Sequence, residues 1–372
     1  MKKVGITGQN GFVGTHLYNT LGLYPEKYER VNFQKEFFDD EAHLDDFVNK
    51  CDVIVHLAAM NRHESQEFIY ETNVALTQKL ADSLKRTGSK AHVLFSSSSQ
   101  EERDNLYGKS KKEGREILAK WAAESEGAFT GMVIPNVFGP FGQPNYNSFV
   151  VTFCYKLTHG EQPEIQQDGE VKLIYVGELV QEIINQIESG ETRDFYEVNH
   201  TSVNKVSEVL AKLENFKKLY FENGEIPELK TPFDYNLFNT FRCYFDIKNH
   251  YPVKFKQHTD NRGAFVEVIR LGIGGQCSFS TTVPGITRGD HYHTRKIERF
   301  AVIKGKALIQ LRKIGTDEVL DFYLVGAEPA YVDMPIWYTH NIQNIGDEEL
   351  YTIFWINEPY NPEDADTYFE KV

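Results

Sequence analysis

Apolar runs alternate with longer amphipathic stretches along the first two thirds of the chain. Between the runs, apolar residues recur three and four positions apart, as in residues 68–88, and this spacing predicts helices. Strand–helix alternation is typical of parallel strands joined by crossover helices. The sequence therefore predicts an α/β domain with a doubly wound, Rossmann-type parallel sheet, whose last long helix covers residues 202–216. The runs expected to form buried strands are residues 3–8, 52–59, 92–98 and 129–137.

From about residue 252 the pattern changes to short β-rich runs separated by Gly, Pro, Asp and Asn, for example at residues 299–313 and 349–356. Several short strands at this spacing predict a sandwiched or closed all-β unit. We expect the boundary near residues 244–252. The sequence thus predicts two domains, residues 1–245 and residues 246–372.

Composition and charge narrow the class of protein. The 372 residues are 41% hydrophobic and 25% charged, which is globular composition and excludes a disordered chain. A net charge of −14 makes nucleic acid and anionic lipid poor partners. No stretch approaches about 18 apolar residues, so we expect no membrane insertion. Four widely separated cysteines without a CxxC pair favour a reducing, cytoplasmic location.

A glycine-rich turn directly follows the first predicted strand. It reads Gly8-Gln9-Asn10-Gly11-Phe12-Val13-Gly14. Glycines at this strand–helix junction let the backbone approach a pyrophosphate, which then lies at a helix N-terminus. The motif alone also fits a tight turn without a ligand, but its position favours dinucleotide binding.

A tyrosine and a lysine share a helix face further along the chain. Tyr107 and Lys111 are four residues apart, and a nearby ammonium would lower the pKa of the phenol. Such a tyrosine can pass a proton to a carbonyl oxygen as hydride reaches the carbon. The hydroxyl cluster at residues 96–99 ends a predicted strand, at the edge where α/β domains bind ligands. An exposed helical pair is the alternative interpretation.

These elements resemble the extended short-chain dehydrogenase/reductase family over residues 1 to about 240. The resemblance implies a catalytic set of Ser98, Tyr107 and Lys111. It implies cofactor contacts from the glycine turn, from Leu57, Ala58 and Ala59, and from Tyr107 and Lys111. It implies substrate contacts from Asn73 and from Asn136, which lies in the segment 135–140.

Two departures from that family narrow the activity. Sugar dehydratases of the family carry Asp-Glu after the catalytic hydroxyl, whereas Ser98 is followed by Ser99 and Gln100, so dehydration is not expected. An acidic residue after the second strand would bind the ribose 2′-hydroxyl of NAD. Residues 30–35 offer basic and amide groups instead, which favours NADP.

Three histidines and a glutamate form a ligand-like set in the C-terminal domain. His291 and His293 alternate on one predicted strand, Glu298 follows, and His340 comes after a proline. Imidazoles with a carboxylate suit a divalent ion such as Zn²⁺. With Gly285 and Gly305, the first three ligands match the motif G-x5-H-x-H-x4-E-x6-G of the cupins, which implies a jelly-roll barrel. A second cupin motif is partly kept in Pro335, His340 and Asn344, but Trp337 replaces its usual glycine.

Residues 258–265 and 287–292 resemble dTDP-4-keto-6-deoxyhexose 3,5-epimerases, which abstract a proton next to a sugar ketone. The resemblance implies that Arg288 contacts the sugar or the diphosphate. In those enzymes the base is the histidine at the position of His291, which the metal would occupy here. The sequence does not identify another base.

The whole chain resembles bifunctional epimerase/reductases of capsular polysaccharide synthesis. The resemblance implies C3 epimerisation of UDP-2-acetamido-2,6-dideoxy-4-hexulose in the cupin. NADPH-dependent reduction at C4 would follow, giving UDP-N-acetyl-6-deoxy-L-talosamine on the route to UDP-N-acetyl-L-fucosamine. We also expect a homodimer, since cupins often pair through their β edges. Two alternatives stay open: a protein that senses NADP or sugar without turnover, and an NAD-dependent sugar C4 epimerase with a structural cupin.

Overall fold

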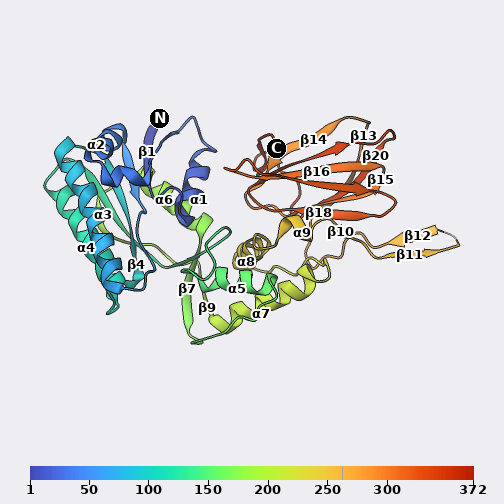
Figure 1. Ribbon diagram of the computed structural model, residues 1–372, viewed down its shortest axis with the longest axis horizontal. Coiled ribbons are helices and arrows are strands. Elements are labelled where there is room, and N and C mark those ends of the chain that lie inside the picture. Colours follow the sequence, from blue (N-terminus) through green and yellow to red (C-terminus); the bar gives the residue numbers. More distant parts are fainter. Residues whose placement is uncertain (262) are drawn as a thin grey trace. The chain divides into compact units, whose positions relative to one another are not determined.

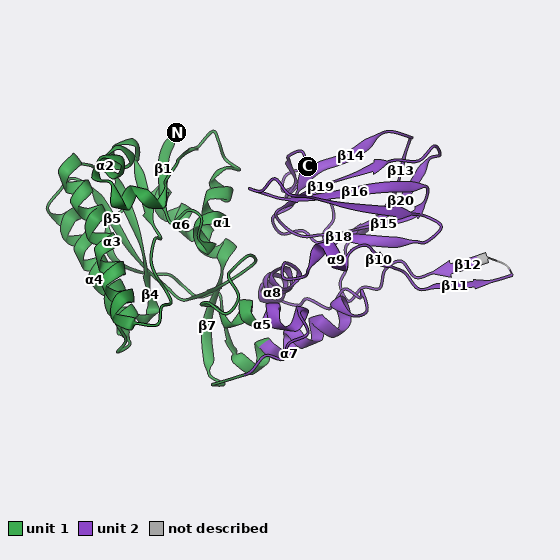
Figure 2. Cartoon of the chain, in the orientation of Figure 1, with its two compact units in different colours: residues 1–152, 165–209 green, residues 153–164, 210–372 purple. Residues whose placement is uncertain are grey.

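The computed structural model describes residues 1–261 and 263–372. Its contacts divide the chain into two compact units, residues 1–152 with 165–209 and residues 153–164 with 210–372 (Figure 2). This division differs from the boundary predicted at residues 245 and 246, because the helical residues from 210 onward group with the β-rich part. Where the cupin module begins along the chain stays a prediction.

The first unit contains a six-stranded parallel sheet in the order β2-β1-β3-β4-β5-β8. Figure 1 labels β1 and β4 of this sheet. The strand order reverses on either side of β1, as a doubly wound α/β fold requires, and the predicted fold class is confirmed. The predicted strands appear close to their expected positions. The four predicted strands are β1 (Lys2–Thr7), β3 (Val53–His56), β4 (His92–Ser98) and β5 (Ala128–Ile134), and the sheet also contains β2 (Tyr28–Val31) and β8 (Arg193–Glu197).

Helices cover both faces of this sheet because its strands are apolar on both sides. On β3, Val53 and Val55 belong to one core cluster, whereas Ile54 belongs to the other. The first cluster packs under α1 (Phe12–Leu21) and α6 (Val176–Ser189). The second packs under α2 (Glu41–Lys50), α3 (Gln66–Thr87) and α4 (Leu106–Ala123). A three-stranded sheet completes the unit, formed by β6 (Asn136–Phe138), β7 (Glu170–Tyr175) and β9 (Ser202–Lys205).

The second unit contains two five-stranded antiparallel sheets, which confirms the predicted all-β architecture. Their orders are β10-β18-β15-β20-β13 and β17-β16-β19-β14-β21. A separate hairpin pairs β11 (Gln257–Asp260) with β12 (Gly263–Val266). The sheet strands are β10 (Val253–Lys254), β13 (Gln276–Thr282), β14 (Thr287–Tyr292), β15 (Glu298–Lys304), β16 (Lys306–Lys313), β17 (Val319–Val325), β18 (Ala330–Met334), β19 (Tyr338–Asn344), β20 (Leu350–Ile356) and β21 (Tyr368–Phe369).

Helices run later in the chain than the sequence pattern suggested. Helix α5 (Phe149–Thr158) and α7 (Val206–Phe216) both cross the division between the units. The prediction that the last long helix ends at residue 216 was wrong, because α8 (Pro232–Arg242) follows, and then the short α9 (Ile247–His250). A capping box between Thr231 and Asp234 starts α8, with a proline in its first turn. Among the described residues, no helix is both long and apolar enough to cross a lipid bilayer.

A buried polar network joins the helical and β parts of the second unit. Arg299 on β15 makes two contacts of 2.7 and 3.0 Å with Asp333 on β18, and both side chains are buried. The hydroxyl of Tyr220 donates to Asp333 at 2.6 Å. Arg242 of α8 donates to that hydroxyl at 3.2 Å and to the carbonyl of Met334 at 2.8 Å. Burial would favour the neutral carboxyl, but the two guanidinium groups and Tyr220 hold the pKa of Asp333 below its usual range.

We expect Asp333→Ala to lower the free energy of unfolding by about 3–5 kcal/mol, since it leaves the Arg299 guanidinium buried without its partner. Urea unfolding followed by circular dichroism measures this loss. Glu328→Ala is the control, because it removes an exposed ion pair with Lys254 and should leave stability nearly unchanged. Equal behaviour of the two variants would show that the buried pair does not stabilise the unit.

Candidate functional site

The glycine turn between β1 and α1 has the close backbone packing that a dinucleotide site requires. Gly8 has a left-handed φ of 77°, and its carbonyl accepts a hydrogen bond from the Gly11 amide at 2.9 Å. A Cβ added to Gly14 would lie 2.2 Å from the Gly8 carbonyl oxygen. No side chain caps the N-terminus of α1 at Gly11, so its first amides are available to an anion.

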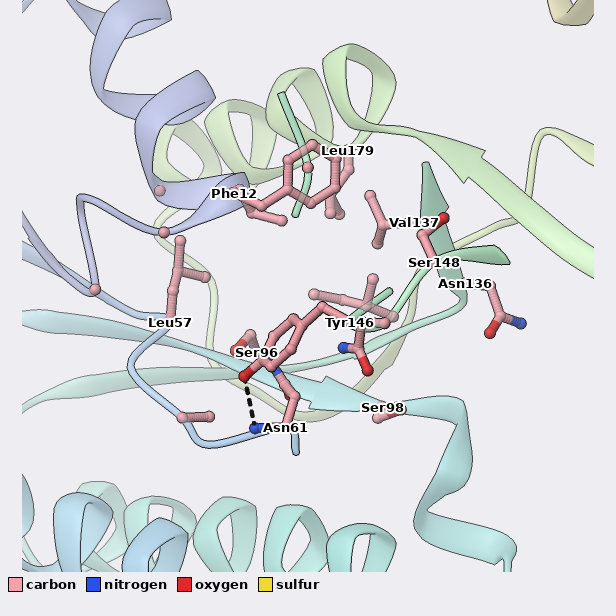
Figure 3. A pocket seen from close by; sticks show the side chains of 18 of the residues that line it. Phe12, Leu57, Asn61, Ser96, Ser98, Asn136, Val137, Tyr146, Ser148 and Leu179 are labelled. Atoms are coloured by element: carbon pink, nitrogen blue, oxygen red, sulfur yellow. Dashed lines mark hydrogen bonds between the residues drawn. The ribbon is translucent and has the colours of Figure 1, made fainter. Parts of the chain in front are cut away.

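A cavity of about 600 Å³ opens beside this turn (Figure 3). It brings together most of the residues that the sequence predicted for the first domain. Asn136 and the hydroxyl cluster at residues 96–99 line the same cavity as the glycine turn. The predicted residues that line it are Gly8, Asn10, Gly11, Phe12, Val13, Gly14, Leu57, Ala58, Ala59, Ser98, Tyr107, Lys111 and Asn136.

Asn73, predicted to contact substrate, is not among the cavity-lining residues. Its side-chain amide accepts from the Met60 amide at 2.6 Å and donates to the Met60 carbonyl at 3.0 Å. It also donates to the hydroxyl of Ser110 on α4 at 3.2 Å. Asn73 therefore holds the loop that follows β3 against α4. Its contact with substrate stays a prediction.

Tyr107 and Lys111 lie on the first turns of α4, which Asn105 caps. The ammonium of Lys111 donates to the Ser96 carbonyl at 2.8 Å and lies 5.9 Å from the centre of the Tyr107 ring. Burial raises the pKa of Tyr107 to about 12, against a smaller lowering by the Ser98 hydroxyl. The lowered pKa expected from the ammonium is thus not found, because desolvation of the phenolate outweighs it. Burial also lowers the pKa of Lys111 to about 8.

The carboxylate nearest to Ser98 along the chain is already paired. Glu101 accepts from the Ser97 hydroxyl and from the Arg115 guanidinium, at 2.9 Å to one oxygen and 2.8 Å to the other. Both partners of this ion pair are largely buried. Both oxygens of this carboxylate are thus engaged by other residues. The absence of dehydration stays a prediction.

Sequence reasoning missed two residues of this site. The amide side chain of Gln9 joins the glycine turn to the end of β2, since it donates to Asn32 at 3.2 Å and accepts from the Phe33 amide at 3.2 Å. Tyr146 lines the cavity, and its hydroxyl accepts from the Asn61 amide at 3.3 Å (Figure 3). No motif marks Tyr146, because it lies in an irregular loop that reaches the cavity only through folding.

The predicted metal ligands of the second unit lie together. One ligand atom from each of His291, His293, Glu298 and His340 lies within 4.8 Å of the other three. The Glu298 carboxylate lies 3.2 Å from Nε2 of His293 and 3.2 Å from Nε2 of His340. Burial would raise the pKa of Glu298, but its contacts with His293 and His340 hold that pKa well below its usual range. Burial and the two other histidines lower the pKa of His291 to about 4, so this imidazole is neutral at neutral pH.

This donor set fits a divalent cation. Nε2 of His340 is buried and makes no hydrogen bond of acceptable geometry among the described residues. A buried polar atom normally has a partner, and a metal ion bound to the lone pair of this nitrogen would be one. Nδ1 of His293 lies 2.6 Å from the Asp366 carbonyl and donates its proton to it, so the lone pair of Nε2 is the one that can bind a metal. Three imidazoles and one carboxylate are a common ligand set for zinc, iron or manganese.

Trp337 explains why the second cupin motif usually has a glycine here. Its φ is 61°, a left-handed value that costs a bulky residue strain. Its amide donates to the His293 carbonyl at 2.8 Å, and its ring stacks on Tyr292. Trp337 thus adopts the backbone conformation that favours glycine, and its ring contacts Tyr292, which lies between His291 and His293.

Arg288, the remaining predicted site residue, is exposed on β14. Its guanidinium makes a long contact of 3.5 Å with the Thr281 carbonyl, so it is loosely held. Arg262, part of the epimerase-like segment, lies outside the described residues.

Family comparisons identify the class of protein that this fold and these sites define. The model of the NAD dependent epimerase/dehydratase family matches residues 4–199, more than half of the chain. The chain belongs to this family. The model of the polysaccharide biosynthesis C-terminal domain matches residues 258–368.

Individual relatives are similar over the whole chain. A UDP-2-acetamido-2,6-beta-L-arabino-hexul-4-ose reductase of Pseudomonas aeruginosa is 31% identical over 98% of both chains. The crystal structure of the capsular polysaccharide assembling protein CapF of Staphylococcus aureus is 33% identical and covers 100% of both chains, with a TM-score of 0.62. The spore coat polysaccharide biosynthesis protein SpsL of Bacillus subtilis is 28% identical over 30% of this chain and 82% of its own length.

We expect Lys111→Met to raise the free energy of unfolding by about 1–2 kcal/mol at pH 7. A pKa lowered from 10.5 to about 8 means that the buried ammonium destabilises the fold, and the lost hydrogen bond offsets only part of the gain. The folded lysine loses its proton first, so this penalty is full below about pH 8 and fades as the pH rises toward 10.5.

Thermal unfolding at several pH values measures the effect. The gain from Lys111→Met should shrink between pH 8 and pH 10. Lys109→Met is the control, because Lys109 lies on the same helix with an exposed side chain. A Lys111→Met variant that is less stable than the parent at pH 7 would show that the buried Lys111 ammonium does not destabilise the fold.

Proposed function

We propose that the chain is a bifunctional nucleotide-sugar enzyme of polysaccharide synthesis. In the second unit it inverts C3 of UDP-2-acetamido-2,6-dideoxy-4-hexulose. In the first unit it reduces the C4 ketone with NADPH, giving UDP-N-acetyl-6-deoxy-L-talosamine on the route to UDP-N-acetyl-L-fucosamine. The observation that carries the proposal is the common cavity of the glycine turn with Ser98, Tyr107 and Lys111. The reductase from P. aeruginosa, similar over its full length, supports the sugar.

In the proposed reduction, Ser98 and Tyr107 hold the C4 oxygen and Tyr107 supplies its proton. A pKa of about 12 keeps the phenol protonated at neutral pH, so it starts the reaction as a donor. NADPH, when bound, supplies the hydride. Lys111 holds the ribose and, while charged, stabilises the phenolate that forms as the proton leaves.

The end of β2 supports NADPH over NADH. In an NAD site, an acidic residue at the end of the second strand binds the ribose. In this chain β2 ends at Val31 and Asn32 follows, and the side chain of Asn32 accepts a hydrogen bond from Gln9. Without a carboxylate there, a 2′-phosphate meets no repulsion, and Arg30 and Lys35 add positive charge nearby. A kcat/KM at least tenfold higher with NADPH than with NADH is the expected result.

In the second unit, we propose that His291, His293, Glu298 and His340 hold one divalent ion, Zn²⁺ by preference. Such an ion would act as a Lewis acid on a ketone oxygen. Arg288 binds the diphosphate or the sugar, and its exposed, loosely held side chain is free to do so. In the first unit, Asn136 at the cavity wall binds the sugar nucleotide.

We further propose a cytoplasmic homodimer. All four cysteines are free thiols, as in a reducing compartment. The edge strand β13 exposes Phe279 and gives a partner both an apolar side chain and an open backbone edge. Light scattering on the purified protein measures the mass and so tests the dimer.

Two alternatives predict different behaviour. A sensor would bind NADP without turnover, although a proton donor such as Tyr107 has no use in a sensor. An NAD-dependent C4 epimerase would hold its cofactor tightly, so cofactor that survives gel filtration favours it. Absence of NADPH oxidation with any keto sugar favours the sensor.

The deciding assay follows NADPH absorbance with the UDP-linked 4-keto substrate in D₂O, with mass analysis of the product. Oxidation of NADPH together with one solvent deuterium on carbon is expected. Oxidation without deuterium would leave a plain ketoreductase and remove the epimerase step.

Tyr107→Phe should lower the rate of reduction by about 10²–10⁴-fold, since it removes the proton donor. Deuterium exchange at C3 should persist, because that step is assigned to the second unit. Tyr70→Phe is the control, since it loses a hydroxyl outside the cavity that pairs with Glu113. Loss of both reduction and exchange in Tyr107→Phe would contradict separate sites.

His291→Ala or Glu298→Ala should abolish stoichiometric metal binding, because each removes one of four ligands. Elemental analysis of the purified variants measures the zinc content. His258→Ala, which removes an exposed histidine of the hairpin, should keep the parent's content. Full occupancy in either ligand variant would refute the assignment.

A further inference from the structure

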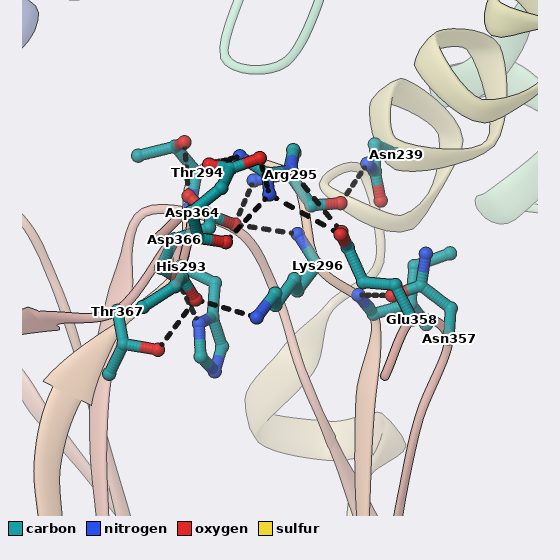
Figure 4. Close-up of polar contacts among 12 residues, drawn as sticks. Asn239, His293, Thr294, Arg295, Lys296, Asn357, Glu358, Asp364, Asp366 and Thr367 are labelled. Carbon is teal, nitrogen blue, oxygen red and sulfur yellow. Dashed lines mark hydrogen bonds and ion pairs between the residues drawn. The ribbon is translucent and has the colours of Figure 1, made fainter. Parts of the chain in front are cut away.

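The loop that begins with His293 and leads to Glu298 is hydrogen-bonded at each position to the C-terminal segment (Figure 4). We call residues 357–371 the C-terminal strap and residues 293–297 the ligand loop. The Ile297 amide donates to the Asn357 side chain at 2.8 Å. The buried ammonium of Lys296 donates to the Ala365 carbonyl at 2.6 Å. The ligand loop therefore takes its shape from the strap rather than from a regular element.

Asp366 makes the central contacts of the strap. Its carboxylate accepts from the amides of Thr294 and Arg295 at 3.0 Å each and of Lys296 at 3.1 Å, and from the Thr294 hydroxyl at 2.6 Å. Its own carbonyl accepts the Nδ1 proton of His293 at 2.6 Å. These bonds coexist because Asp366 has a left-handed φ of 42°, which directs carbonyl and carboxylate to the same loop. The residue is 4% exposed, so the bonds are shielded from water.

The strap also contacts the strands that carry the other two histidines. Its short strand β21 pairs with β14, where Phe369 lies opposite His291. The hydroxyl of Thr339, next to His340 on β19, donates to the Glu370 carbonyl. Three separate ligand-bearing segments thus meet the strap.

We propose that Asp366 is a positioning residue for the metal centre and that the strap and the metal stabilise each other. The inference rests on the metal site of the proposed function. The Asp366 carbonyl fixes the tautomer and ring orientation of His293, so that Nε2 faces the other ligands. The carboxylate holds the ligand loop so that Glu298 enters β15 at the right place. Since coupling between two sites is reciprocal, bound metal should in turn hold the strap in place.

The first test measures metal affinity in the full-length protein with Zn²⁺ and a competing chelator. Asp366→Ala should weaken Zn²⁺ binding by about 10–100-fold, the usual cost of losing a partner of a metal ligand. Asp366→Asn tolerates the left-handed φ and keeps one acceptor oxygen, so it should lose less. Asp364→Asn is the matched control: it removes only the charge of an exposed strap residue paired with Arg295 and should bind like the parent.

A second readout separates positioning from simple support of the fold. Co²⁺ in the parent gives a visible absorption spectrum set by its ligand geometry. That spectrum should change in Asp366→Ala and Asp366→Asn, whereas a residue that only stabilises the fold would leave it unchanged. If Asp366→Ala does not fold, the Asn variant decides on affinity and spectrum.

Hydrogen exchange tests the reverse direction of the coupling. In the parent, adding Zn²⁺ should slow amide exchange of Thr294, Arg295 and Lys296, and in Asp366→Ala it should not. Parent protein that binds no Zn²⁺ or Co²⁺ would overturn the proposed metal centre and this inference with it. Parent protein that binds metal, with Asp366 variants of equal affinity and unchanged spectrum, would overturn the positioning role alone.

Discussion

The buried ion pair between Arg299 and Asp333 determines the arrangement of the second unit, because neither charge can stay buried without the other. The two residues lie opposite each other on β15 and β18, so the pair fixes the register of these strands. Glu298 directly precedes Arg299, and a slip by one residue would turn its side chain to the other face of the sheet. An electrostatic requirement far from any solvent therefore sets where a candidate metal ligand lies. Through Tyr220 and Arg242, the same pair brings α8 into this unit.

Burial shapes the chemistry of both candidate sites, and it acts in opposite directions on different groups. In the cavity, burial raises the pKa of Tyr107, which keeps its proton, and lowers the pKa of Lys111, which loses its proton more easily. In the histidine cluster it keeps His291 neutral, which is the form that binds metals. Burial thus keeps Tyr107 and His291 in the protonation state that the proposed chemistry needs.

Local signals were enough to predict the glycine turn, the Tyr107–Lys111 pair and the four-residue cluster, because each is a short pattern with a fixed geometry. The sequence analysis missed α8, although Thr231 and Asp234 mark its start and Leu237, Phe238 and Phe241 are spaced as on one helix face. It could not have found Tyr146 or Asp366, since an irregular loop and a chain end reach their sites only through tertiary contacts. The pKa of Tyr107 was misjudged for a related reason: spacing reveals the lysine but not the depth of burial.

Trp337 has a consequence for how this protein can be observed. It replaces a glycine beside the His293 carbonyl and stacks on Tyr292, so its indole lies against the chain that carries two histidines of the cluster. Of the three tryptophans of the chain, Trp121 belongs to the first unit, and Trp355 lies on β20 opposite Arg299, the residue after Glu298. The emission of Trp337 and Trp355 is therefore an intrinsic optical probe of the cluster and of the strand that begins with Glu298. Relatives that keep the glycine have no such fluorophore at this position.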